Sequence, residues 1–342
     1  MSAATTRTSD QTTAGTTATR RTARFHRPGW ARRPGAAAGP AGTPVSPSGG
    51  EKLLEAIGLG KTFGNGVRAV DDVSLTVGRG ETVGIVGESG SGKSTTAKMI
   101  LGLLAPDEGD VFFDGVPLRG LPRARMRALR ARLQVVPQNP QTSLNPRLTV
   151  RSSIEFNLRA HGAERVARRT IVPEMLERVG LTPTHAERFP HELSGGQLQR
   201  VAIARALATR PDLVVCDEAV SALDKSVQAQ VLNLLAELQA DLGVSFLFIS
   251  HDLAVVEHIA DQVTVMYLGR VVEQGPAAQL WTSPRHEYTR ALLAATPGRA
   301  LEEAAGRDRP MIPVQPSGAD GGAAGSGTAA TTGQAAASRP PG

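Results

Sequence analysis

A glycine-rich run that ends in lysine and serine is the strongest chemical signal in this chain. It reads GESGSGKS and extends from Gly87 to Ser94. Backbone N–H groups can crowd around phosphate oxygens only where no Cβ obstructs the approach, and glycine also adopts backbone angles that other residues avoid. The ammonium of Lys93 can then reach the β- and γ-phosphates of a nucleotide, and the hydroxyl of Ser94 can bind Mg²⁺. The run therefore predicts a nucleotide-binding loop.

The segments on either side of this loop support the same interpretation. An apolar, strand-like run, TVGIV, precedes it, and the helix-like run TTAKMILGLL follows. A helix that begins near Lys93 would point the positive end of its dipole at the phosphates. A flexible Gly/Ser surface loop would not require these flanking elements. The residues expected to contact the nucleotide are Gly87, Glu88, Ser89, Gly90, Ser91, Gly92, Lys93, Ser94 and Thr95.

Two adjacent acids, Asp217 and Glu218, close a second apolar run, LVVCD. In open α/β sheets the carboxyl ends of the strands face the ligand, so both carboxylates are expected beside the phosphates. Asp217 would hold Mg²⁺ directly or through water, and Glu218 would act as general base on the attacking water. Taken alone, the pair is better explained as an ordinary acidic exit from a strand. Its combination with the lysine-containing loop favours the catalytic interpretation.

A lone histidine, His251, follows a third apolar run, FLFIS. A single histidine is often only a satisfied polar group or a neutral surface residue. Here the preceding strand would deliver it to the same sheet edge as Asp217, which favours a place in the site.

The segment LSGGQ, from Leu193 to Gln197, has the composition of another anion-binding helix start. It offers a serine and two glycines before the helical run LQRVAIARALA. Ser194 could equally be a plain helix N-cap, and the two interpretations are compatible because both place a hydroxyl and free N–H groups at the helix start. The motif alone does not say what it would bind.

Short apolar runs alternate with helical periodicities along the chain, which predicts an α/β fold with a parallel sheet. An antiparallel sheet is expected beside it, from LLEAIGLGKTF, VDDVSLTV and GDVFFDG. Between Leu144 and Leu207 the pattern is helical, which indicates a subdomain inserted into the sheet topology. The expected parallel strands are Thr82 to Val86, Leu133 to Val136, Leu213 to Asp217, Ser245 to Ile249 and Gln262 to Tyr267.

The formal net charge of the 342-residue chain is +6, and its N-terminal segment accounts for that excess. Residues 1–50 are rich in Thr, Ala, Gly, Pro and Arg, and ordering them would cost more entropy than their burial could return. The remainder is close to neutral, so no specific nucleic-acid partner is expected. No run approaches the roughly 20 apolar residues that cross a bilayer. The single cysteine, Cys216, excludes a disulfide within the chain.

Five motifs in a fixed order give the chain a family resemblance: GESGSGKS, PQNPQTSLNPR, LSGGQLQR, VVCDEAVSALD and FISHDL. Together they resemble the ATP-binding subunit of an ABC transporter. The resemblance implies a P-loop NTPase with a RecA-like core, an antiparallel β subdomain and an inserted helical subdomain. The expected parts are a disordered basic tail at 1–50, the ATPase domain at 51–275 with its helical subdomain at about 140–208, a C-terminal extension at 276–297 and a mostly disordered tail at 298–342.

The same resemblance implies a head-to-tail dimer. Ser194, Gly195, Gly196 and Gln197 of one protomer would then contact the nucleotide that the other protomer holds, and Asp224 would lie at the dimer seam. A homodimer and a heterodimer with a second ATPase subunit are both possible, and the heterodimer is the usual arrangement in such systems.

Three further roles come from motif position. Gln138 would sense Mg²⁺ and the attacking water, so it is expected both in catalysis and among the metal ligands, with Ser94 and Asp217. His251 would contact the γ-phosphate and position the base, Glu218. Phe63, in GKTFGNG, matches the aromatic residue that stacks on adenine; a buried aromatic in the side sheet is the alternative.

The C-terminal wording YLGRVVEQGP with PRHEYTRALLAATP resembles the oligopeptide/dipeptide importer subfamily. Three departures from the usual wording are Pro137, where an aromatic residue usually precedes the glutamine, Lys225, where valine is usual after SALD, and Glu287, which replaces the proline of HPYT. The resemblance implies an ATP- and Mg²⁺-dependent ATPase at the cytoplasmic face of a bacterial plasma membrane, with permease subunits and an extracytoplasmic substrate-binding protein. Import of nickel or another small solute, an exporter ATPase, and a soluble ABC ATPase are the alternatives to peptide import.

Overall fold

A six-stranded sheet contains all the strands that the sequence predicted as buried and parallel. The computed structural model describes residues 51–64 and 66–295. Neighbouring strands run parallel except for the antiparallel pair β10 and β9. In spatial order the strands are β10 (Arg270–Pro276), β9 (Gln262–Tyr267), β3 (Thr82–Val86), β8 (Ser245–Ser250), β7 (Leu213–Asp217) and β6 (Leu133–Val136).

The prediction of the parallel strands is confirmed, with β8 one residue longer than expected and the edge strand β10 not foreseen. Alternate residues of β7 enter two different cores: Leu213 and Val215 pack in one, while Val214 and Cys216 pack in the other. Burial of this kind on both faces is why these strands are apolar throughout rather than alternating with polar residues.

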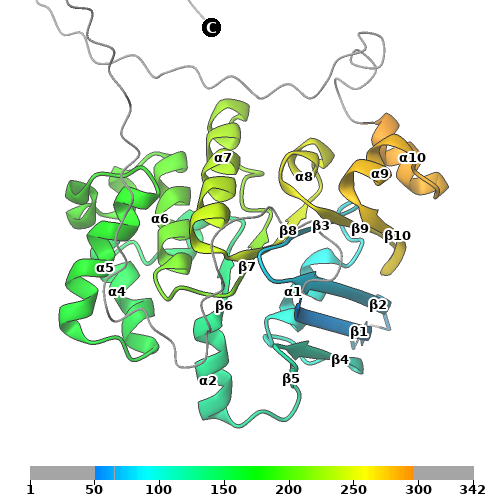
Figure 1. Ribbon diagram of the computed structural model, residues 1–342, viewed down its shortest axis with the longest axis horizontal. Helices are drawn as coiled ribbons and strands as arrows, with labels where there is room; N and C mark the ends of the chain where they lie inside the picture. The colour runs from blue at the N-terminus through cyan, green and yellow to red at the C-terminus, as the bar shows by residue number, and fades with distance from the viewer. Residues whose placement is uncertain (1–50, 65, 296–342) are drawn as a thin grey trace, which may run out of the picture. The chain divides into compact units, whose positions relative to one another are not determined.

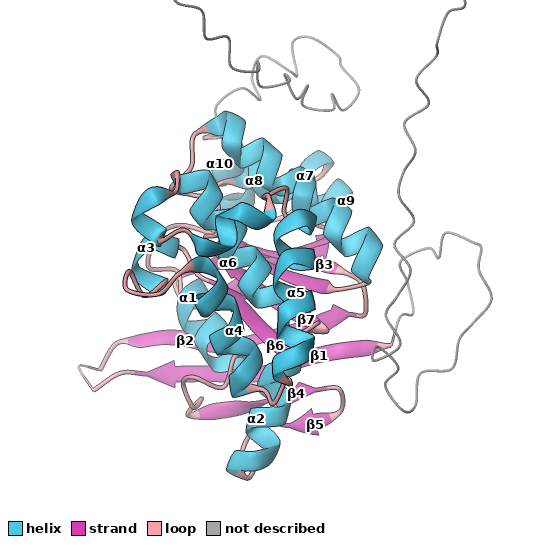
Figure 2. Ribbon diagram, turned by 90° about the vertical axis from the view of Figure 1, so that its left-hand side faces the viewer, coloured by secondary structure: helices cyan, strands magenta, loops and turns pink. Residues whose placement is uncertain are grey.

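A second, four-stranded sheet forms the expected antiparallel subdomain (Figure 2). Its side chains share a core with helix α1 (Lys93–Ile100) and with one face of the six-stranded sheet. In spatial order its strands are β2 (Arg68–Gly78), β1 (Lys52–Thr62), β4 (Glu108–Phe113) and β5 (Val116–Pro117).

The inserted helical segment lies between β6 and β7 in the chain, as predicted. Its helices α4, α5 and α6 gather beside the six-stranded sheet (Figure 1) and share the larger core with its second face. Thr149 caps α4 by accepting a hydrogen bond from the N–H of Ser152. The helices are α3 (Pro140–Ser143), α4 (Val150–Ala160), α5 (Arg165–Arg178), η2 (Pro183–Glu187), η3 (Pro190–Glu192) and α6 (Gly195–Leu207).

The remaining helices complete the layers and the C-terminal segment. Helix α2 (Arg123–Arg132) precedes β6, and α7 (Lys225–Leu242) and α8 (Leu253–Ile259) cover the sheet face that contributes to the larger core. Helices α9 (Ala277–Thr282) and α10 (Glu287–Ala294) follow the edge strand β10. The side chains of Trp281 and Leu293 anchor these two helices, since each is buried in the larger core.

Two expectations from the sequence fall outside the described residues: the disordered tails at 1–50 and at 298–342. Within residues 51–64 and 66–295, no helix combines the length and the apolar character that crossing a bilayer requires.

Glycine at position 84 is required by the close approach of α8 to the middle of β3. A Cβ at Gly84 would lie 2.2 Å from Cγ1 of Val256, which is fully buried. We therefore expect Gly84→Ala to lower the free energy of unfolding by about 1 to 3 kcal/mol, the usual cost of overpacking a core. Urea denaturation measures the change. Gly275→Ala is the matched control, because a Cβ there meets no atom within 4 Å, and an equal loss in both variants would contradict the prediction.

Candidate active site

The glycine-rich loop connects the end of β3 to the start of α1, as predicted. Its backbone makes two approaches that only glycine allows. Gly87 has φ of 151°, and a Cβ there would lie 2.2 Å from the carbonyl oxygen of Met266. Gly92 has φ of 100°, and its Cβ would lie 2.5 Å from the carbonyl oxygen of Ala69. The loop is therefore held tightly against neighbouring backbone at both of its ends.

Lys93 places a nearly buried ammonium inside this loop, with 4% of the residue exposed. Its Nζ donates to the carbonyl oxygens of Gly87 at 2.7 Å and Glu88 at 2.6 Å. Burial lowers the pKa of Lys93, while nearby carboxylates, first that of Glu218, act in the opposite direction. The N-cap of α1 is Gly92, so no capping side chain accepts from the first-turn amides. A positive charge and a helix N-terminus thus converge where the sequence predicts phosphate binding.

Ser94 and Asp217 meet, although 123 residues separate them in the chain. The Ser94 hydroxyl donates to Oδ1 of Asp217 over 3.2 Å. Burial raises the pKa of Asp217, and the hydrogen bond from Ser94 opposes that effect. A hydroxyl and a carboxylate at one point supply the oxygen ligands that Mg²⁺ prefers, so this pair fits the predicted metal role.

The side chain of Glu218 lies where residues that follow three different strands meet. Its Oε2 accepts a hydrogen bond from Nε2 of Gln138 over 2.6 Å, and its Oε1 lies 3.5 Å from Nδ1 of His251. Gln138 follows β6, Glu218 follows β7 and His251 follows β8. The backbone of Glu218 has φ of 49°, and its N–H donates to the carbonyl oxygen of Ile249 over 2.9 Å. The carboxylate is therefore oriented both by its own backbone and by two side chains.

The LSGGQ segment begins α6 with a reciprocal capping box. The Ser194 hydroxyl accepts from the N–H of Gln197 over 3.3 Å, and Oε1 of Gln197 accepts from the N–H of Ser194 over 3.0 Å. The plain capping interpretation is thus confirmed, and Ser194 and Gly195 are exposed as well. Among the described residues, neither Ser194 nor Gln197 hydrogen-bonds to the Gly87–Ser94 loop. The anion-binding role stays a prediction.

Asp224 and Phe63 also have clear positions in the fold. Asp224 caps α7 by accepting from the N–H of Val227 over 3.0 Å. Phe63 lies between β1 and β2 and is 42% exposed, so the alternative of a buried aromatic is wrong. An exposed ring on the β subdomain is available for stacking, and its role at adenine stays a prediction.

Reasoning from the sequence missed one ion pair and one contact. Nζ of Lys225 lies 2.7 Å from Oδ2 of Asp252, which gives the unusual, exposed lysine after SALD a half-buried partner next to His251. The hydroxyl of Tyr288, in the C-terminal segment, accepts a hydrogen bond from the N–H of Glu88. No local pattern could reveal the Tyr288 contact, because 200 residues separate its two partners.

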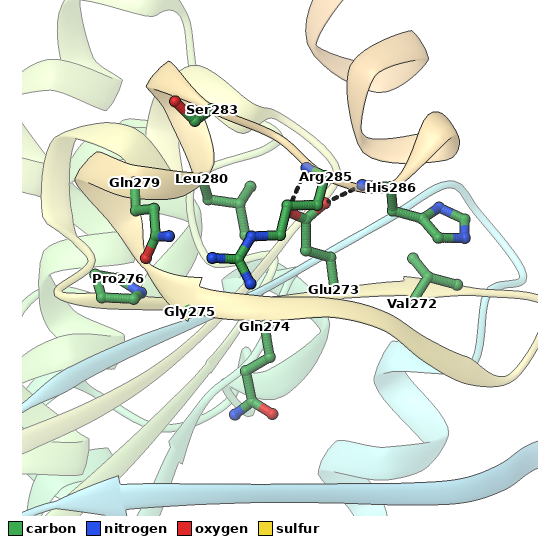
Figure 3. Close-up of a pocket in the computed structure, with 10 residues that line it drawn as sticks. All are labelled: Val272, Glu273, Gln274, Gly275, Pro276, Gln279, Leu280, Ser283, Arg285 and His286. Atoms are coloured by element: carbon green, nitrogen blue, oxygen red, sulfur yellow. Dashed lines mark hydrogen bonds between the residues drawn. The ribbon is translucent and has the colours of Figure 1, made fainter.

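A cavity of about 340 Å³ lies outside the predicted nucleotide site, between β10 and the start of α10 (Figure 3). None of its lining residues belongs to the site predicted from the sequence. The lining residues are Val272, Glu273, Gln274, Gly275, Pro276, Gln279, Leu280, Ser283, Arg285 and His286.

Comparison with known proteins explains this arrangement. Residues 70–221 match the family described as ABC transporter. The dimeric structure of the ATP-binding cassette MJ0796, in a post-hydrolysis state bound to ADP and Pi, is 31% identical; the match has a TM-score of 0.59 and covers 66% of this chain and 99% of that one. The chain belongs to the ABC transporter family. Both the predicted P-loop fold and the class, an ABC-type ATPase, are thereby confirmed.

Other relatives agree with the ABC assignment. A probable peptide ABC transporter ATP-binding protein, y4tS of Sinorhizobium fredii, is 52% identical over 232 residues, or 68% of this chain and 66% of that protein. The glutathione import ATP-binding protein GsiA of Escherichia coli O157:H7 is 52% identical over 235 residues, or 68% of this chain and only 37% of GsiA. The structure of cbiO1 from Clostridium perfringens, part of the ABC transporter complex cbiONQ, has a TM-score of 0.64 at 29% identity and covers 73% of this chain and 99% of that one.

If Phe63 stacks on adenine, Phe63→Ala should weaken ATP binding about tenfold, since stacking a base on an aromatic ring contributes about 1 to 3 kcal/mol. Phe63→Trp should retain the affinity. Titration with a fluorescent ATP analogue measures both. Phe156→Ala removes another exposed phenylalanine, 61% exposed on α4, and serves as the control. Unchanged affinity in Phe63→Ala would remove the residue from the nucleotide site.

Proposed function

We propose that this chain is the ATP-hydrolysing subunit of a bacterial ABC importer for oligopeptides or dipeptides. The observation that carries the proposal is the position of Glu218. Its carboxylate lies between Gln138 and His251, at the sheet edge where Ser94 meets Asp217. A carboxylate fixed beside a phosphate-binding loop is suited to remove a proton from an attacking water.

The geometry supports a separate role for each of these residues. Lys93 and the first-turn amides of α1 would hold the phosphates of ATP, the substrate. Ser94 and Asp217 would hold Mg²⁺, with Gln138 close by; when bound, the ion would neutralise charge on the phosphate oxygens. Glu218 would accept the proton of the attacking water, and the hydrogen bond from Gln138 would keep its carboxylate aimed at that water.

The second half of each nucleotide site would come from a partner ATPase subunit. The helix start, with Ser194 and Gly195 exposed and Gly196 half-buried, would face the phosphates bound by the other subunit. The capping box gives this segment a fixed shape, and a Cβ at Gly196 would lie 2.6 Å from Cγ1 of Val227, so this backbone packs closely on α7. The dimeric state of the similar cassette MJ0796 supports the arrangement. The expected partner is a related ATPase in a heterodimer, and a second copy of this chain is the alternative.

Peptides are the proposed cargo because the relatives are named for peptide transport and for import of glutathione, which is itself a small peptide. Cargo would be met by other polypeptides: two permease subunits in the membrane and an extracytoplasmic substrate-binding protein. The chain would attach peripherally to the permeases at the cytoplasmic face of the plasma membrane.

Two measurements test the assignment. The first is purification of the tagged chain from its own membranes in mild detergent, followed by mass spectrometry. We expect two permeases, a second ATPase and an extracytoplasmic peptide-binding protein to copurify; an exporter-type permease, or soluble proteins alone, would contradict import.

The second measurement is uptake of a labelled tripeptide by a strain from which the gene for this chain has been deleted. The parent chain should restore uptake and Glu218→Gln should not, whereas equal uptake in the deleted and parent strains would exclude this peptide as cargo.

A further inference from the structure

The phosphate-binding loop has a hydrogen-bond partner in the C-terminal segment. The N–H of Glu88, the second residue of the loop, donates to the hydroxyl of Tyr288 over 3.1 Å. Glu88, Ser89 and Gly90 are the exposed stretch of the loop. On the other side of this stretch, the carbonyl oxygen of Ser91 accepts from the N–H of Gly269 over 3.1 Å. Bonds from outside the loop therefore hold the first residue of this stretch, Glu88, and the residue that follows it, Ser91.

Tyr288 is held in place by a second aromatic ring. Its ring packs against that of Tyr267, with centroids 4.2 Å apart and planes inclined by 31°. Tyr267 is the last residue of β9, the strand that pairs with β3 immediately before the loop. Tyr288 is also partly buried against the larger core. The position of its hydroxyl is thus determined by the sheet that carries the loop.

The helix that bears Tyr288 is anchored to the edge strand β10 through Glu273. The carboxylate of Glu273 accepts hydrogen bonds from the N–H groups of Arg285 at 2.8 Å and His286 at 3.0 Å, drawn as dashed lines in Figure 3. His286 in turn caps α10 by accepting from the N–H of Tyr288 over 3.1 Å. The side chain of Leu293, near the C-terminal end of α10, is buried. A continuous set of contacts therefore joins β10 to the loop.

We propose that the C-terminal segment 276–294 positions the phosphate-binding loop for ATP, and that the hydroxyl of Tyr288 is the positioning group. Tyr288 acts through the backbone of Glu88. A loop held in its binding geometry before ATP arrives loses less conformational freedom on binding, so the nucleotide binds more tightly. This inference rests on the proposed function, because it assigns Tyr288 to the same ATP site.

The test is Tyr288→Phe, which removes the hydroxyl and keeps the ring. One hydrogen bond corresponds to about a threefold to tenfold change in affinity. We expect the Kd values for ATP and ADP to rise together by that factor, KM to rise with them and kcat to stay within about twofold. Exchange of backbone hydrogen for deuterium in the peptide that contains Glu88 should become faster in the absence of nucleotide.

Tyr267→Phe is the matched control, since it also removes a tyrosine hydroxyl from the stacked pair but leaves the bond to Glu88. Its nucleotide affinity should equal that of the parent. Unchanged affinity and exchange in Tyr288→Phe, or an equal loss in both variants, would overturn the inference and leave the ATP site intact. A parent chain that binds no ATP would overturn the proposed function, and the inference with it.

A double-mutant cycle tests the anchor. Glu273→Ala should weaken ATP binding severalfold in the parent background, because α10 loses its attachment to β10. In the Tyr288→Phe background the same change should weaken binding by less than about twofold, since positions linked through one hydrogen-bond network, here by way of His286, are not additive. Equal effects in both backgrounds would show that Glu273 does not act through Tyr288, and would overturn the proposed route from β10 to the loop.

Discussion

Glu218→Gln should hydrolyse ATP about 100-fold to 10,000-fold more slowly than the parent chain, the range that positioned general bases contribute. A carboxamide has nearly the same shape as the carboxylate, so the bond from Gln138 and the backbone geometry at φ of 49° can persist. MgATP binding should therefore be retained, and the closed dimer should accumulate because ATP is not consumed. Phosphate release measures the rate, and size-exclusion chromatography with MgATP measures the dimer.

The control for this variant is Glu155→Gln, which makes the same chemical change on α4, outside the site. Its rate should match that of the parent. Normal hydrolysis by Glu218→Gln would show that another group acts as the base. A loss of MgATP binding in that variant would instead show that the carboxylate holds the site together.

Lys93→Ala should act one step earlier, on nucleotide binding itself. Lys93 is 4% exposed and is surrounded by loop atoms, so its charge would meet the phosphates with little screening by water. Removing such a charged partner should weaken ATP binding by about 2 to 4 kcal/mol, a factor of about 30 to 1,000. Titration with a fluorescent ATP analogue gives the Kd.

Two comparisons separate binding from folding in this variant. Lys93 also donates to two loop carbonyls, so thermal unfolding without nucleotide must be measured beside the titration. Lys52→Ala removes the same charge from an exposed position at the start of β1 and should bind ATP normally. A folded Lys93→Ala chain with parental affinity would contradict the phosphate role of the lysine.

Much of the fold was predictable because its strongest signals are local. Short runs such as TVGIV and LVVCD are buried on both faces, so they are apolar throughout and bounded by polar or glycine residues. The edge strand β10 escaped prediction because its residues are mostly half-exposed and lack such a run. The helix start at Ser194 was visible as a capping residue, although capping alone could not distinguish a structural role from a binding one. The capping of α7 by Asp224 was not foreseen.

For the site, the sequence by itself determined the residue types and which strand end carries each of them. Asp217 ends a buried strand, Gly87–Ser94, Glu218 and His251 follow directly after such strands, and parallel strands must bring their carboxyl ends to one edge. Only the tertiary structure decided the pairings: Ser94 with Asp217, Glu218 between Gln138 and His251, and Tyr288 with Glu88. The physical reason is that a hydrogen bond forms only when its donor and acceptor are placed to within a few tenths of an ångström, and these groups lie up to 200 residues apart in the chain. Sequence spacing carries no such information, whereas the packed sheet and the anchored C-terminal helix do.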